Sequence, residues 1–204
     1  MKMTIETEAI RAALHCAAKK DARYYLCGVL VRVTKPEFGV AMVCGTDGCV
    51  LFAGQSVINW TGEPQTGAFD LIIPYDVCEI IAKFKGSTTV IESLPDGRYL
   101  ANNTIFTAVD GRFPDVARVI PKTISGETAQ FDPALLVRAN DALGDYYSTR
   151  RVSYRLDHNG YDAAVMHSND NKAIAVIMPL RFTGGSRECD VDRWTNNKFD
   201  RSFL

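Results

Sequence analysis

Residues 110–121, DGRFPDVARVIP, carry two prolines and an Asp-Gly turn in the middle of the chain. Pro114 and Pro121 each have a fixed φ angle and no backbone N–H, so neither a long helix nor a central strand is expected here. The stretch therefore predicts a stiff connector between two structured regions. Working outward from it, the chain shows the same order of helix and strand signals on both sides.

The sequence predicts three amphipathic helices, at residues 8–19, 74–84 and 133–143. Each segment repeats apolar side chains with a period of about 3.6 residues, which places them on one helical face. The first helix is expected to begin after Thr7 and the third after Asp132. Thr and Asp favour these positions because their side chains accept hydrogen bonds from the free N–H groups of a helix start.

One strand-like run precedes each predicted helix, and two or three follow it. The preceding runs are KMTIET at 2–7, GAFDLIIP at 67–74 and ETAQFDP at 127–133. We expect these runs to be strands, because β-branched and aromatic residues are frequent in them and turn residues separate them. The chain is therefore predicted to repeat a βαβββ unit three times, with a period of about 60 residues.

This pattern predicts an α+β fold of three βαβββ half-domain units. Residues 1–122 are expected to form a domain of two units, residues 123–182 the third unit, and residues 183–204 a C-terminal tail. Each unit is expected to need a neighbour to bury its open face. Three separate α+β segments of one irregular domain are the alternative.

The composition is that of an ordinary globular chain, with 47% hydrophobic and 23% charged residues among 204. No run approaches the roughly 18 apolar residues of a membrane-spanning helix, and the first residues lack the pattern of a secretory signal. A cytoplasmic protein without membrane contact is therefore expected. The net charge of −1 argues against tight non-specific binding of nucleic acid but leaves local basic patches open.

Little in the sequence points to catalysis. The three histidines are scattered, none lies in a recognisable nucleophile motif, and there is no glycine-rich phosphate loop. The six cysteines include no CxxC pair and are expected to be reduced thiols. Cys27, Cys44 and Cys49 could in principle hold a metal ion, but buried thiols on strands are the better interpretation. We expect no enzyme, no cofactor and no metal site.

Four motifs, in order along residues 2–182, resemble the bacterial DNA polymerase sliding clamp, the beta subunit of DNA polymerase III. They are RYYLCGVLVRV at 23–33, GTDGCVLFA at 45–53, DGRFPDVARVIP at 110–121 and AVIMPLRF at 175–182. The resemblance implies a clamp-like fold and a protein that tethers replication or repair proteins to DNA. The chain departs from the family in offering three half-domain units where a bacterial clamp subunit has six, with one half-domain missing between Pro121 and Glu127.

The resemblance also implies a shallow apolar pocket for a linear peptide from DNA polymerases or other clamp-binding proteins. By motif, its walls are Leu26, Thr46, Gly48, Leu51, Pro121, Val176, Met178 and Pro179, with Arg181 at the rim. Met and branched apolar side chains suit such a site because they adapt to several peptide sequences. Leu26, Leu51 and Val176, taken singly, fit plain core equally well. Cys49 and Val50 stand where the family commonly has a polar and a basic residue.

If the helices face DNA as they do in the family, the resemblance implies a weak, non-specific DNA contact. The candidate residues are Lys19, Lys20, Arg23, Tyr24, Tyr25, Lys83, Lys85, Arg138, Arg150 and Arg151. The bland alternative is that these side chains solvate the surface or complement helix dipoles. Neighbouring acids, Asp21, Asp141 and Asp145, weaken the patch.

Two functions follow from these expectations. In the first, the protein forms a homo-oligomer that encircles DNA as a clamp, since four copies of three units supply the family's twelve half-domains. In the second, it is a non-encircling module that keeps the peptide pocket and competes for or sequesters clamp-binding partners. The tail adds one hypothesis, that its apolar end, Phe203-Leu204, imitates a clamp-binding peptide.

Overall fold

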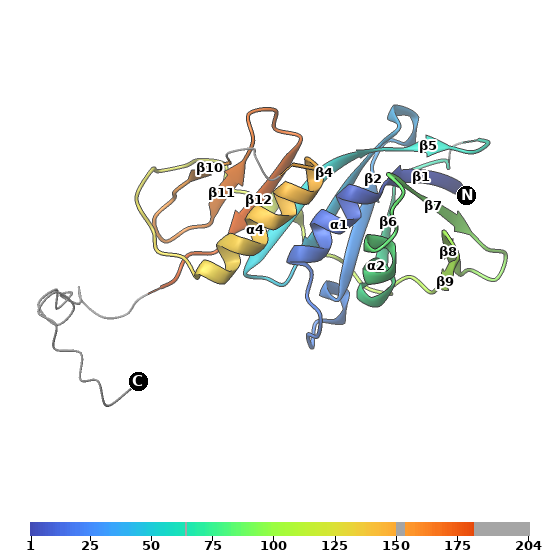
Figure 1. Cartoon of the computed structure of the whole chain (residues 1–204), viewed down its shortest axis with the longest axis horizontal. Coiled ribbons are helices and arrows are strands. Elements are labelled where there is room, and N and C mark those ends of the chain that lie inside the picture. The colour runs from blue at the N-terminus through green and yellow to red at the C-terminus, as the bar shows by residue number, and fades with distance from the viewer. Residues whose placement is uncertain (64, 150–153, 182–204) are drawn as a thin grey trace, which may run out of the picture.

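The structure is a computed structural model that describes residues 1–63, 65–149 and 154–181. The described residues form two antiparallel sheets with helices packed on one face (Figure 1). The α+β class predicted from the sequence is therefore confirmed. The tail of residues 183–204, and with it Phe203-Leu204, lies outside the described residues.

The chain follows the predicted succession of strands and helices, except that, among the described residues, no strand directly precedes the third predicted helix. The first unit consists of β1 (Lys2–Glu6), α1 (Thr7–Cys16), the 3-10 helix η1 (Tyr24–Leu26), β2 (Gly28–Val33), the 3-10 helix η2 (Pro36–Phe38), β3 (Val40–Thr46), β4 (Val50–Val57) and the short β5 (Asn59–Trp60). The second consists of β6 (Phe69–Pro74), α2 (Tyr75–Ala82), β7 (Thr88–Ser93), β8 (Tyr99–Ala101) and β9 (Thr104–Phe106). The one-turn helix α3 (Val116–Val119) precedes the third unit, α4 (Pro133–Tyr146), β10 (Arg155–Asp157), β11 (Ala164–His167) and β12 (Ala173–Ile177).

The first two units exchange their first strands. β1 pairs with β7 of the second unit, and β6 pairs with β2 of the first. The third unit joins the first through its last strand, because β12 pairs antiparallel with β4. The result is a seven-stranded sheet in the order β10-β11-β12-β4-β3-β2-β6 and a five-stranded sheet in the order β5-β1-β7-β8-β9.

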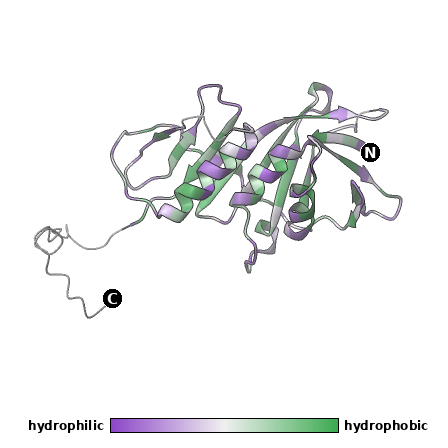
Figure 2. Ribbon diagram, viewed as in Figure 1, coloured by the Kyte–Doolittle hydropathy of each residue, from purple (hydrophilic) through white to green (hydrophobic). Residues whose placement is uncertain are grey.

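The main core lies between the sheets and the helices α1, α2 and α4. Phe52 of β4 and Leu143 of α4 are fully buried there, and the strands behind α1 and α4 are largely hydrophobic (Figure 2). A second, smaller cluster lies on the opposite face of the seven-stranded sheet. In it Phe113 and Val116 of the connector pack against Leu30 and Leu51 of the sheet.

The connector at residues 110–121 is anchored at its centre. The carboxylate of Asp115 accepts a hydrogen bond from Ala117 N at 3.1 Å and so begins the single turn of α3. Val116 points into the small cluster, whereas Val119, at the end of the turn, is 37% exposed. One face of this turn therefore holds the connector on the sheet, and the other face is exposed to solvent.

The expected cap of the first helix is wrong. α1 begins after Glu6, and the buried hydroxyl of Thr7 instead makes a hydrogen bond of 2.9 Å with the hydroxyl of Thr89. Thr89 lies on β7, which pairs with β1, so the strand exchange between units brings these two residues together. α1 also ends at Cys16, before the expected residue 19.

The expected strand at residues 127–133 does not form. Its backbone bonds instead with the β10–β11 loop and the chain after β12, from Gly160 N to Glu127 O at 2.8 Å and from Leu180 N to Gln130 O at 2.7 Å. The first strands of the other two units each pair with the neighbouring unit. Within the described residues the third unit has no neighbouring unit on the side of β10. The segment at 127–133 therefore has no strand of another unit to pair with.

Candidate functional site

A cavity of about 220 Å³ lies where the connector, the β3–β4 turn and the chain after β12 meet. Apolar side chains dominate its lining, and Arg23, Tyr25 and Thr46 contribute polar groups. The lining residues are Arg23, Tyr25, Leu26, Thr46, Gly48, Cys49, Val50, Leu51, Pro114, Val119, Val176 and Met178. We call this cavity the connector pocket.

The β3–β4 turn forms one rigid wall of the connector pocket. The Thr46 hydroxyl donates to Val50 O at 2.8 Å and accepts from Gly48 N at 3.0 Å. The Asp47 carboxylate accepts hydrogen bonds from the N–H groups of Cys49, at 2.8 Å, and Val50, at 3.0 Å. Gly48 has a φ of +95°, a value that side chains other than glycine rarely adopt. The Thr-Asp-Gly sequence thus specifies the shape of this wall.

The end of β12 forms the opposite wall. Val176 lies directly across from Leu51 in the sheet, and Met178 N donates to Cys49 O at 2.9 Å. This last bond keeps the chain beside the turn after the strand has ended at Ile177. Met178 is half-buried, so part of its flexible thioether side chain faces the pocket.

Six of the nine residues predicted for a peptide pocket line the connector pocket. They are Leu26, Thr46, Gly48, Leu51, Val176 and Met178. Pro121, Pro179 and Arg181 lie outside the lining. Within the connector, Pro114 and Val119 provide the wall expected of Pro121. Both belong to the same stretch of sequence, but only the turn of α3 shows which of its residues face outward.

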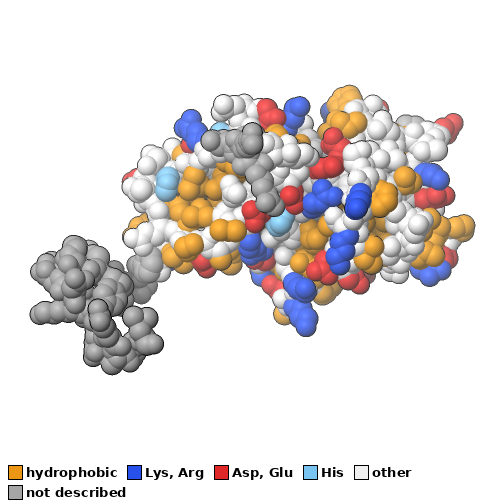
Figure 3. Space-filling view, viewed as in Figure 1, with side chains coloured by type: hydrophobic (Ala, Val, Ile, Leu, Met, Phe, Trp, Pro, Cys, Tyr) orange, Lys and Arg blue, Asp and Glu red, His pale blue; other side chains and the backbone are white. Residues whose placement is uncertain are grey.

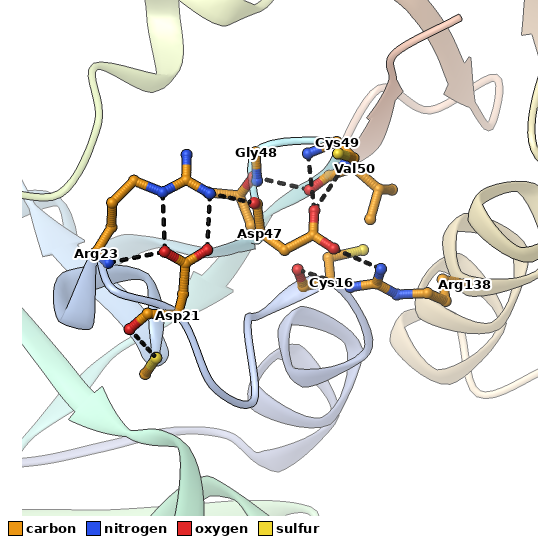
Figure 4. Close-up of polar contacts among 10 residues, drawn as sticks. Cys16, Asp21, Arg23, Asp47, Gly48, Cys49, Val50 and Arg138 are labelled. Carbon is orange, nitrogen blue, oxygen red and sulfur yellow. Dashed lines mark hydrogen bonds and ion pairs between the residues drawn. The ribbon is translucent and has the colours of Figure 1, made fainter. Parts of the chain in front are cut away.

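Arg23 closes one side of the connector pocket. Its guanidinium binds the Asp21 carboxylate through two nitrogens, at 3.0 and 2.7 Å, and also donates to Asp47 O at 2.9 Å (Figure 4). Hydrogen bonds from the Arg23 side chain and backbone lower the pKa of Asp21 to about 2. A Cβ atom on Gly48 would lie 3.0 Å from Arg23 Nη1, so the two residues are in close contact.

A larger, open groove of about 1280 Å³ lies on the helical side of the molecule, next to the connector pocket. Lys and Arg side chains gather near the centre of this side, interspersed with Asp and Glu (Figure 3). The charged lining residues are Arg11, Lys19, Lys20, Asp21, Arg23, Asp47, Glu79, Lys83, Arg138 and Asp145, and His15 lies among them. Arg23, Asp47 and Cys49 lie at the β3–β4 turn or beside it, and this turn separates the groove from the connector pocket.

Arg138 of α4 makes its contacts inside the protein. Its guanidinium donates to the carbonyl oxygens of His15, at 2.8 Å, and Cys16, at 3.2 Å, and so caps the end of α1. A third nitrogen pairs with the Asp47 carboxylate at 2.6 Å. Burial favours the neutral form of Asp47, but the hydrogen bonds from Arg138, Cys49 and Val50 prevail and lower its pKa. This pair joins the third unit to the first.

Two of the other cations predicted to bind DNA are also held by carboxylates. Lys19 pairs with Glu79 at 3.4 Å, and Arg23 is held by Asp21. Lys20, Lys83 and Lys85 are exposed and form no ion pair within the described part of the chain. Arg150 and Arg151 lie outside the described residues.

The two predicted tyrosines separate. Tyr24 is 58% exposed, whereas Tyr25 lines the connector pocket, and their rings meet edge to face with centroids 5.9 Å apart. Tyr25 therefore belongs with the pocket rather than with the helical groove. Sequence position alone could not separate them, because the two residues are adjacent in η1.

Among the described residues, no group of His, Cys, Asp and Glu side chains is arranged to hold a metal ion. Of the cysteines considered for such a site, Cys44 is buried, Cys27 half-buried and Cys49 exposed. In the same part of the chain, no helix has the length and apolar character needed to cross a membrane.

The overall structure is similar to solved bacterial sliding clamps. The Helicobacter pylori beta clamp bound to a DNA ligase peptide superposes with a TM-score of 0.70 at 15% sequence identity, covering 88% of this chain and 66% of that one. The DNA polymerase III subunit beta of Pseudomonas aeruginosa gives a TM-score of 0.66 at 17% identity, covering 89% of this chain and 67% of that one. No family model and no curated protein matches the sequence. The chain therefore has the sliding-clamp fold and spans about two thirds of the length of these clamps.

Proposed function

We propose that this protein is a clamp-like, non-enzymatic tether that binds a short linear peptide of a DNA polymerase or another DNA-processing protein in the connector pocket. The observation that carries the proposal is the pocket itself, an apolar cavity at the place where three segments distant in sequence meet. In the similar Helicobacter pylori clamp the bound partner is a DNA ligase peptide.

The size and chemistry of the connector pocket suit a peptide. Its volume of about 220 Å³ is smaller than the roughly 300 Å³ at which pockets for small molecules begin, so it fits a few side chains. Met178 offers an adaptable apolar contact and Val119 a stiffer one, and the Arg23 side chain lies at one edge. Because the turn and the connector are already held in place, the protein loses little conformational entropy when a peptide binds.

A fluorescein-labelled DNA ligase peptide, titrated with the protein and followed by fluorescence anisotropy, tests the proposal. Val119→Asp places a charge in the pocket wall at a partly exposed position, so binding should weaken at least tenfold. Val137→Asp is the matched control, because Val137 is 56% exposed on α4 and lines neither cavity. Equal affinities of the wild type and Val119→Asp, with both folded, would refute a peptide site in this pocket.

For the DNA contact, we propose a weak interaction at the helical groove that rests mainly on Lys20 and Lys83, which line it, and on the exposed Lys85, two residues after Lys83. Removing one lysine that binds a phosphate should reduce the slope of log affinity against log salt by about 0.9 for duplex DNA. The variant with all three lysines replaced by Glu should therefore show weaker binding and a shallower salt slope. An unchanged slope would mean that these lysines do not bind phosphate.

The second candidate function is a non-encircling module that captures clamp-binding peptides without holding DNA. One observation favours it: Arg23, Arg138 and Lys19, all on the helical side, are engaged by Asp21, Asp47 and Glu79. Competition separates the two functions. The capturing module should displace the labelled peptide from a bacterial clamp and should not itself remain bound to circular DNA. A tether should remain bound to circular DNA together with the labelled peptide.

A further inference from the structure

The two sheets end in four edges, and these edges differ in how they are protected. The edge of β6 is covered by the chain that leads into the connector, with Val109 N donating to Ile72 O at 3.0 Å. The edge of β10 carries the ion pair of Arg155 and Asp157, and β5 is only two residues long. Charges, short length and covering segments are the usual means of keeping an edge from pairing with another strand.

The edge formed by β9 has neither charges nor a covering segment within the described residues. Its sequence from Asn102 to Val109, NNTIFTAV, contains no charged residue. Among the described strands β9 pairs with β8 alone, and Ile105 in its middle is 52% exposed. An edge strand turns half of its N–H and C=O groups away from its neighbour, so β9 presents both unpaired main-chain groups and an apolar side chain.

The rest of the molecule shows what the equivalent strands do. β9 is the third strand after the α-helix of its unit, as β4 is in the first unit and β12 in the third. β4 and β12 pair with each other in antiparallel fashion, from Gly54 opposite Ala173 to Val50 opposite Ile177. The third strands of two units therefore pair with each other in this fold, and β9 is the third strand left without such a partner inside the described chain.

We infer that β9 is a docking edge for β9 of a second copy of this chain, paired antiparallel about a two-fold axis at Ile105. Because the strand is uncharged, pairing it with itself brings no like charges together. Ile105 would lie opposite its counterpart and Thr104 opposite Phe106 of the other copy, combinations that favour strand pairing. The two five-stranded sheets would then continue into one.

The position of β9 leaves room for this partner. β9 lies at the opposite end of the molecule from β10 (Figure 1). The connector pocket is lined by residues at the β3–β4 turn and the end of β12, whose strands lie between these two ends. A dimer formed through β9 therefore leaves both pockets open. A strand of three residues provides few main-chain hydrogen bonds, so the dimer should be reversible. The inference does not depend on what the connector pocket binds.

Sedimentation equilibrium of the full chain over a wide range of concentration measures the association. We expect the wild type to approach twice the monomer mass of 22.5 kDa as concentration rises. Ile105→Lys should remain monomeric, because the two-fold axis would bring two ammonium groups together. Ile80→Lys is the matched control, since Ile80 is also 52% exposed but lies on α2, and it should dimerise like the wild type.

A cross-linking experiment locates the interface. Directly opposed residues of antiparallel strands have Cα atoms about 4.5–5.5 Å apart, within the range that a disulfide spans. Under mild oxidation Ile105→Cys should form a covalent dimer, whereas Ile80→Cys and the wild type, which retain the exposed Cys49, should not. A wild type that stays monomeric at every concentration, or a dimer that survives Ile105→Lys, would overturn the inference. Binding of extended peptides at β9 without self-association would do so as well.

Discussion

Asp47 joins three parts of the protein through one side chain and one carbonyl group. Its carboxylate fixes the β3–β4 turn and pairs with Arg138 of α4, and its carbonyl oxygen accepts from Arg23 (Figure 4). The turn around Asp47 could be predicted from Thr46-Asp47-Gly48, because its bonds are local. The partner could not, since Arg138 is 91 residues away and resembles any surface cation in sequence.

The Asp47–Arg138 pair predicts a pH dependence of stability. The folded state lowers the pKa of Asp47 below the unfolded value of about 3.9, so the stabilisation is full above that value and is lost as pH falls through the lower, folded pKa. Urea unfolding at neutral pH should show Asp47→Asn to be less stable than the wild type by about 1–3 kcal/mol. The difference should shrink toward zero in strong acid. A difference that stays constant with pH would mean that the charge on Asp47 does not stabilise the fold.

At the scale of the element, local signals predicted the three helices and most strands, because capping residues and apolar periodicity act within a few residues. The strand expected at 127–133 failed for the opposite reason. Its residues favour a strand, but a strand also needs a neighbour, and the first two units gain theirs only by exchange. The connector pocket was predictable in part. The β3–β4 turn follows from local sequence, whereas the exposure of Val119 depends on how α3 packs on the sheet.

The β3–β4 turn can be tested by replacing its glycine. Gly48→Ala should destabilise the protein by about 1 kcal/mol or more and weaken peptide binding, because φ is +95° and Cβ would press on Arg23. Gly62→Ala is the control, with a φ of +87° and no atom within 4 Å of the added Cβ. Both variants place alanine at a positive φ, so both bear the same kind of backbone strain. A loss of peptide affinity in Gly48→Ala alone, measured by anisotropy, would therefore come from the contact between the added Cβ and Arg23. Equal affinities would show that the turn does not shape the pocket.

At the scale of the whole molecule, the third unit is joined to the first by a shared sheet and a shared core. β12 continues the sheet at β4, and α4 packs on α1 with Leu143 in the main core. The division at residues 122 and 123 stays a prediction from the sequence, which shows the connector but not the packing across it. If the shared core governs stability, the described units should unfold together.

Leu143→Ala tests this coupling. Removing a fully buried leucine should cost about 2–5 kcal/mol. With one core, the decrease in stability should appear equally in the first and third units. Hydrogen exchange of the β3 and β11 amides in dilute denaturant measures both. A decrease in protection confined to β11 would show that the third unit unfolds by itself.

The central claim, that the connector pocket binds a linear peptide, is tested most directly by NMR of the protein labelled at its methyl groups. On addition of the DNA ligase peptide, the methyl signals of Leu51, Val119, Val176 and Met178 should shift together and saturate. Those of Val57 and Val137, which are exposed outside the pocket, should stay in place. Shifts confined to the helical groove, or none at the pocket when the peptide is in excess, would contradict the account.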